Sequence, residues 1–149
     1  MKKFLFYLVH WTWGLAVNLP GLIVYLLLKR KGCASEPFGK DGCNAYITYL
    51  PWDKGGISLG LFICMRKTDN AEWTHNTRIH EYGHTWQCLL LGPLYWLVIG
   101  IPSFVWCNAV FPKLKAKQPE ASYYDFYPES WANAWGERGS GQSRTISDT

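Results

Sequence analysis

Two histidines lie four residues apart in RIHEYGHTWQ, the stretch from Arg78 to Gln87, and a glutamate directly follows the first. On a helix each residue turns about 100° and rises about 1.5 Å, so His80 and His84 share one face and can reach a single ion. Glu81, one position round, can contact a water at that ion without being a ligand. This spacing is typical of a zinc site with the glutamate as general base.

A catalytic zinc ion takes three protein ligands and keeps one open position. No histidine follows His84 in the chain. His75 precedes His80 by five residues and would lie about 140° round the same helix, which makes it a poor partner on the same ion. We therefore expect a carboxylate to complete the site.

Glu129 is our candidate for the third ligand, because it falls in the first turn of a helix for which Pro128 supplies the first position. Asn133, four residues later, shares its face and can orient a ligand. Asp125, just outside that helix, is the alternative. Acids on loops or late helix turns are usually only solvated, and the weaker candidates of this kind are Glu120 and Glu137.

Three tyrosines crowd the same segment, at positions 123, 124 and 127. A tyrosine hydroxyl can stabilise the oxyanion of a tetrahedral intermediate, and we select Tyr127 for this catalytic role. Aromatic packing at a membrane interface is the alternative for each of them.

The elements that must position these residues begin with the HExxH helix. Asp69 with Glu72 resembles a capping box, Thr74 or Asn76 offers a later start, and Gly92-Pro93 supplies the end. Before it, residues 45–50 and 55–65 alternate in hydrophobicity around PWDKGG, which predicts a small antiparallel β-hairpin. In the second run the apolar side chains at every second position from 57 to 65 are expected to share one face.

Two long uncharged runs flank this middle part. Phe4 to Leu28 exceeds the roughly 20 helical residues that cross a bilayer, so we expect a membrane helix. His10, Asn18 and Pro20-Gly21 interrupt it, which leaves a kinked helix or an interfacial element open. The run from Thr85 to Pro112 is cut at residues 92–93 and 100–102, which favours a broken hydrophobic hairpin.

The predicted fold class is therefore α+β and mainly helical. It combines an N-terminal membrane helix, a small antiparallel β-hairpin, the HExxH active-site helix, a broken hydrophobic hairpin and a C-terminal ligand helix. The predicted domains are an anchor over residues 1–31, a minimal zincin-like domain over 32–138 that includes the hydrophobic segment 85–112, and a flexible tail over 139–149.

Charge and composition indicate the partners. The net charge of +4 comes from basic clusters beside the apolar runs, and the chain carries nine Trp, nine Tyr and seven Phe. This arrangement suits anionic lipid headgroups and not nucleic acid. The five cysteines form no CxxC pair, so most are expected to be small buried hydrophobes. Cys33 and Cys43 flank a polar stretch and could pair in an oxidising compartment.

The motifs HEYGH (residues 80–84) and ESWAN (residues 129–133) resemble those of gluzincin zinc metallopeptidases, in which a later helix supplies a glutamate ligand, often as E-x-x-A-[DN]. A closer likeness is to small bacterial membrane-associated proteins with the pattern HEYGHxxQ…LGPLYxxxxGxPS. The resemblance implies zinc on His80, His84 and Glu129, with Glu81 as general base. It also implies that GGISLGLFI forms a rim strand for an extended substrate.

The resulting expectation is a zinc metallopeptidase of the bacterial inner membrane that cuts peptide or protein substrates. The polar approach DNAEWTHNTR favours a site at the bilayer surface. An intramembrane protease is disfavoured, because the uncharged run after His84 contains no acid. A non-catalytic membrane protein with a structural or regulatory zinc site is the remaining alternative.

Overall fold

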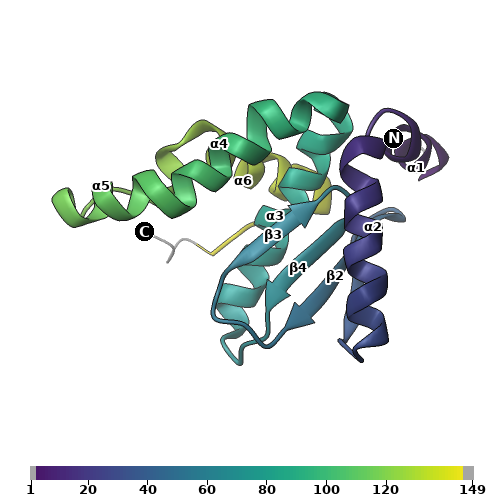
Figure 1. Ribbon diagram of the computed structural model, residues 1–149, viewed down its shortest axis with the longest axis horizontal. Coiled ribbons are helices and arrows are strands. Elements are labelled where there is room, and N and C mark those ends of the chain that lie inside the picture. Colours follow the sequence, from purple (N-terminus) through teal and green to yellow (C-terminus); the bar gives the residue numbers. More distant parts are fainter. Residues whose placement is uncertain (1–2, 146–149) are drawn as a thin grey trace.

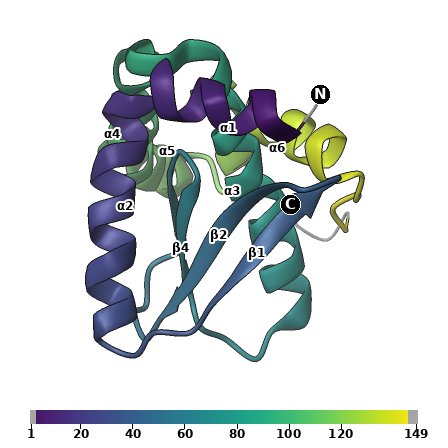
Figure 2. The same ribbon diagram turned by 90° about the vertical axis from the view of Figure 1, so that its right-hand side faces the viewer.

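A small mixed β-sheet lies between two helices in the computed structural model of the chain, which describes residues 3–145 (Figures 1 and 2). Helices cover most of the described chain, so the predicted α+β, mainly helical class is confirmed. The elements in chain order are α1 (Lys3–Thr12), α2 (Leu15–Arg30), β1 (Ser35–Lys40), β2 (Cys43–Leu50), β3 (Gly56–Leu59), β4 (Phe62–Arg66), α3 (Ala71–Leu91), α4 (Ile101–Val105), α5 (Phe111–Lys117) and α6 (Tyr127–Ser140). Short 3-10 or π turns cover Gly92–Leu94, Trp96–Gly100, Trp106–Val110 and Tyr123–Asp125.

The sheet has the order β1-β2-β4-β3, and the predicted antiparallel pairing of residues 45–50 with 55–65 is wrong. β2 and β4 are parallel, β1 pairs antiparallel with β2, and β3 pairs antiparallel with β4. The second run contains its own turn at Gly60, whose φ of +69° favours glycine. Ile57 consequently pairs with Cys64 and lies on the opposite face of the sheet from Ile63 and Met65. The single apolar face predicted for residues 57–65 therefore does not form.

The two faces of the sheet are covered by different helices. One face, with Ile47 and Ile63, packs against Tyr82, which belongs to the HEYGH motif of α3. On the other face, the ring of Tyr25 of α2 contacts the rings of Phe62 and Tyr46. The distances between ring centroids are 5.2 Å to Phe62 and 5.9 Å to Tyr46. The motif helix is therefore held on the sheet by its own buried tyrosine.

The N-terminal apolar segment forms two helices, α1 and α2, bent by 94°. The bend falls at Trp13-Gly14 and not at Pro20-Gly21, because Pro20 lies inside α2. A proline has no N–H to donate to the carbonyl four residues earlier. Here the Nε1 of Trp96 donates to the Ala16 carbonyl at 3.2 Å, which satisfies the acceptor that Pro20 leaves open.

The second apolar run ends α3 at Gly92, as predicted, but it is not cut again at residues 100–102. A continuous helix runs from Trp96 to Lys117, with Pro102 in the first turn of α4 and π turns on both sides of α4. The most apolar 18 residues of this helix have a mean hydropathy of 1.5, and only 6% of them are buried. Among residues 3–145 this is the one helix long and apolar enough to cross a membrane; α1 and α2 pass that test only as a bent pair. The helix extends away from the sheet (Figure 1).

The helix that carries the HExxH motif is capped by Asn70, one residue after the expected Asp69. The Asn70 side chain accepts a hydrogen bond from the Trp73 N–H at 2.9 Å. α3 therefore begins at a capping asparagine, and neither the capping box nor the later starts at Thr74 and Asn76 are used.

The C-terminal helix α6 has Pro128 in its first turn, as predicted, and Phe126 occupies the capping position. It extends to Ser140, two residues beyond the predicted domain boundary. The following segment returns to α3, where the Nε2 of His75 lies 2.9 Å from the Ser143 carbonyl oxygen. Residues 146–149 of the predicted tail lie outside the described residues.

Candidate metal centre

Helices α3 and α6 cross at glycines, and this crossing brings the two motifs together. A Cβ on Gly83 would lie 1.8 Å from the carbonyl oxygen of Ala132, and one on Gly136 would lie 1.9 Å from that of Ile79. Any larger residue would force the backbones apart. Gly83 of HEYGH and Gly136 of α6 therefore allow the close approach of the two helices.

The three predicted ligands converge at this crossing. The Oε2 of Glu129 lies 3.1 Å from the Nε2 of His80 and 3.7 Å from the Nε2 of His84. The three ligand atoms all lie within 4.8 Å of one another, and none of the three residues is more than 6% exposed. Tetrahedral zinc bonds of about 2.1 Å place ligand atoms about 3.4 Å apart. This buried group could hold a metal ion.

The other candidate ligands take no part in the group. The Nε2 of His75 faces the Ser143 carbonyl, an oxygen of Asp125 accepts from the Ser122 N–H at 3.1 Å, and an oxygen of Glu137 accepts from the Arg144 N–H at 3.1 Å. Glu120 is exposed. The structure thus selects Glu129 among the acids that the sequence left open.

Each histidine has its second ring nitrogen held by an amide oxygen. The Nδ1 of His80 lies 2.7 Å from the Oδ1 of Asn133, and the Nδ1 of His84 lies 2.7 Å from the Oε1 of Gln87. Because an amide oxygen only accepts, Nδ1 carries the proton and Nε2 keeps its lone pair for a metal. Gln87 is fixed in turn, since its Nε2 donates to the Pro128 carbonyl at 2.9 Å.

The electrostatics of the group fit a cation. Burial would raise the carboxyl pKa of Glu129, but the imidazoles of His80 and His84 outweigh it and hold that pKa well below its usual range. Burial would lower the pKa of His84, yet the Glu129 carboxylate raises it. The Oε2 of Glu129 is buried and makes no hydrogen bond of good geometry, even at 3.1 Å from His80. Two imidazole nitrogens and one carboxylate oxygen without a hydrogen-bond partner are a donor set suited to zinc.

Glu81 is buried beside the three ligands but is not part of the ligand group. Burial raises its carboxyl pKa, the two histidines oppose this, and Glu129 adds to it. Its Oε2 has no hydrogen-bond partner. A Cβ on Gly56 would lie 2.3 Å from the Oε1 of Glu81, so a glycine in the edge strand β3 makes room for this carboxylate.

The tyrosines occupy different places around the group. The hydroxyl of Tyr127 donates to the Val98 carbonyl at 2.5 Å, and the side chain is partly exposed. Burial and then the charge of Glu129 raise the pKa of the Tyr123 hydroxyl. The ring of Tyr124 lies 5.4 Å from that of His80.

Sequence reasoning assigned no role to Gln87, Ser103 or Gly56. Gln87 follows His84 by three residues, so helical spacing alone could have indicated their contact. The Ser103 hydroxyl donates to the Oε1 of Glu129, which is 26 residues away in the chain. Gln87 and Ser103 both stand in the pattern HEYGHxxQ…LGPLYxxxxGxPS. No local spacing, however, connects Ser103 or Gly56 with the site.

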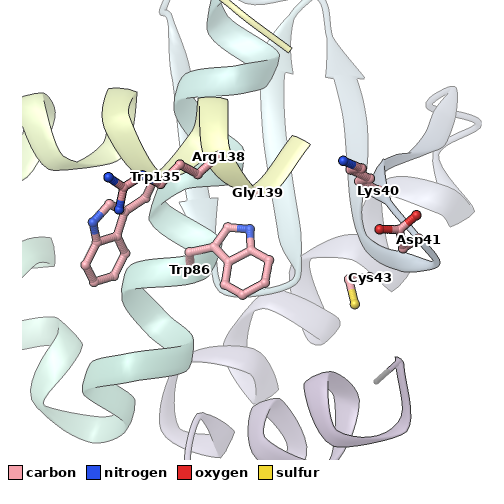
Figure 3. A pocket seen from close by; sticks show the side chains of 7 residues that line it. All are labelled: Lys40, Asp41, Cys43, Trp86, Trp135, Arg138 and Gly139. Atoms are coloured by element: carbon pink, nitrogen blue, oxygen red, sulfur yellow. The ribbon is translucent and has the colours of Figure 1, made fainter. Parts of the chain in front are cut away.

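A surface pocket of about 370 Å³ lies elsewhere, between the β1–β2 turn and the end of α6 (Figure 3). None of the metal-ligand candidates lines it, so this pocket is separate from the candidate metal centre. Its lining residues are Lys40, Asp41, Cys43, Trp86, Trp135, Arg138 and Gly139.

Comparison of the chain with known protein families, with curated proteins and with solved structures finds no match. The functional assignment therefore depends on the geometry of the buried His-His-Glu group.

Proposed function

We propose that the chain is a membrane-associated zinc metallopeptidase. The observation that carries the proposal is the convergence of His80, His84 and Glu129 beside Glu81, whose buried carboxylate oxygen has no hydrogen-bond partner. A structural metal site does not require such an acid next to its ligands, whereas hydrolysis requires a base there.

The roles of the residues follow from their contacts. A zinc ion held by the three ligands would act as a Lewis acid and lower the pKa of a water molecule. Glu81 would accept a proton from the attacking water and pass it to the leaving amine. Asn133 and Gln87 would keep both imidazoles in the tautomer that presents Nε2. An oxyanion role for Tyr127 stays a prediction.

Membrane association is supported by the apolar surface of the Trp96–Lys117 helix. Leu97 is 66% exposed and Phe104 is 67% exposed, and the helix ends in the basic cluster of Lys113, Lys115 and Lys117. Exposed apolar surface of this extent marks a membrane or protein contact, and basic residues beside it favour anionic lipid. We propose that the peptide or protein substrate is cut at the membrane surface.

Glu81→Gln tests the catalytic assignment in the full-length protein, purified in detergent and loaded with zinc. We expect the variant to retain the parental zinc content and to lose hydrolysis of a diverse peptide library, because glutamine cannot accept the proton. Glu129→Ala should lose zinc. Glu72→Gln makes the same chemical change at an exposed position of α3 and should behave like the parent. Parental turnover by Glu81→Gln would refute the assignment.

The deep burial of the group favours one alternative, a non-catalytic membrane protein with a structural or regulatory zinc ion. In that case the parent would bind zinc and stabilise on binding, but it would cut none of the peptides. The parent alone therefore separates the two candidates.

A further inference from the structure

Ser103 contacts the proposed metal ligand from the opposite side to the metal. Its hydroxyl donates to the Oε1 of Glu129, while the Oε2 of the same carboxylate faces both histidines. The two oxygens of Glu129 therefore have different partners. We infer that Ser103 is a positioning residue that makes Glu129 bind the metal through one oxygen; this inference rests on the metal site of the proposed function.

The chemistry of a carboxylate explains why this matters. A carboxylate can bind a metal through one or both oxygens, and a catalytic zinc needs its fourth position open. A hydroxyl that donates to Oε1 forms a charge-assisted hydrogen bond and occupies the oxygen that would otherwise take up that position. Ser103 thus favours the open, three-ligand form of the site.

The fold delivers the Ser103 hydroxyl in a fixed place. One turn before it, Ile99 is fully buried in a cluster with Val17 and Cys88. Less than one turn after it, the Nε1 of Trp106 donates to the Tyr123 carbonyl at 3.0 Å. These contacts hold the face of the Trp96–Lys117 helix that carries Ser103, although the rest of this helix is mostly exposed. The Ser103 hydrogen bond therefore links the apolar helix directly to the proposed metal ligand Glu129.

The test compares Ser103→Ala with Ser103→Thr and Ser103→Cys in the full-length protein in detergent. Zinc affinity is measured by competition with a chelator, and cobalt(II) absorption reports the coordination of the metal. Alanine is the best helix former, so the first substitution does not weaken α4. The matched control is Ser130→Ala, next to Glu129, because the exposed Ser130 hydroxyl donates only to the Tyr127 carbonyl.

We expect Ser103→Ala to bind zinc about 10- to 100-fold more weakly and to change the cobalt spectrum, as for the loss of other groups that orient a metal ligand. Ser103→Thr should keep the parental values, Ser103→Cys, a weaker donor, should lie between, and Ser130→Ala should match the parent. If Ser103→Ala does not fold, Ser103→Cys decides. Parental zinc affinity and spectrum in the folded variant would overturn the inference.

The result is separable from that of the proposed function. A parent that binds zinc and depends on Ser103 but cuts no peptide would support the inference and refute the peptidase. If the parent cuts peptides and Ser103→Ala binds zinc as tightly as the parent, the peptidase would be supported and the inference about Ser103 refuted. A parent that binds neither zinc nor cobalt would refute both.

Discussion

Gly83→Ala should separate the two helices that carry the candidate metal ligands. The new Cβ would lie 1.8 Å from the Ala132 carbonyl oxygen, whereas ordinary van der Waals contact begins at 3.4 Å, so α3 and α6 would have to move apart by about 1.6 Å. The obstacle is backbone, which cannot rotate away as a side chain can. Overpacking of this kind costs about 3 kcal/mol, and the helix preference of alanine over glycine returns about 1 kcal/mol.

The net loss of about 2 kcal/mol corresponds to a thermal midpoint about 4–8 °C lower for a chain of this size. The same displacement would carry Glu129 away from both histidines, although metal-ligand distances tolerate only about 0.2 Å. We therefore expect the zinc affinity of Gly83→Ala to fall at least about tenfold.

Both quantities are measurable on the detergent-solubilised full chain, by circular dichroism on heating and by chelator competition. Gly55→Ala is the matched control, because a Cβ there meets no atom within 4 Å. If Gly83→Ala kept the parental midpoint and zinc affinity while Gly55→Ala did the same, the close helix crossing would not be what holds the ligand group together.

Two further substitutions test contacts that support the site and the fold. Gln87→Ala removes the acceptor for the Nδ1 of His84, so we expect zinc binding about 10- to 100-fold weaker by chelator competition. Gln118→Ala, at an exposed position, is the control and should have no effect. An unchanged zinc affinity in Gln87→Ala would contradict the orienting role of Gln87. Asn18→Ala leaves the buried Leu61 N–H without the acceptor it now meets at 2.7 Å, so the free energy of unfolding should fall by about 1–3 kcal/mol in a denaturant titration. Asn108→Ala, which loses only a bond to its own helix, is the control, and equal stability of the two variants would refute the turn contact.

The sequence by itself determined the local part of the site. The four-residue spacing of His80 and His84 places both on one helix face, since helix geometry depends only on positions along the chain. The three protein ligands expected of a catalytic zinc ion predicted one ligand besides the histidines, and Pro128 indicated the helix that would supply it. The preference for Glu129 over Asp125 was a prediction, and the approach of α3 and α6 brings Glu129 to the histidines.

Only the tertiary structure decided what lies across from each element. The turn at Gly60 changes the side chains that share a sheet face, and the alternating run from 55 to 65 does not reveal it, because a hairpin and one long strand show the same alternation. Gly100 and Pro102 do not interrupt their helix, because the π turns accommodate them. The Ser103 contact joins residues far apart in the chain. Spacing along a helix is set by covalent geometry, but the partner of an oxygen such as the Oε1 of Glu129 depends on how whole helices pack.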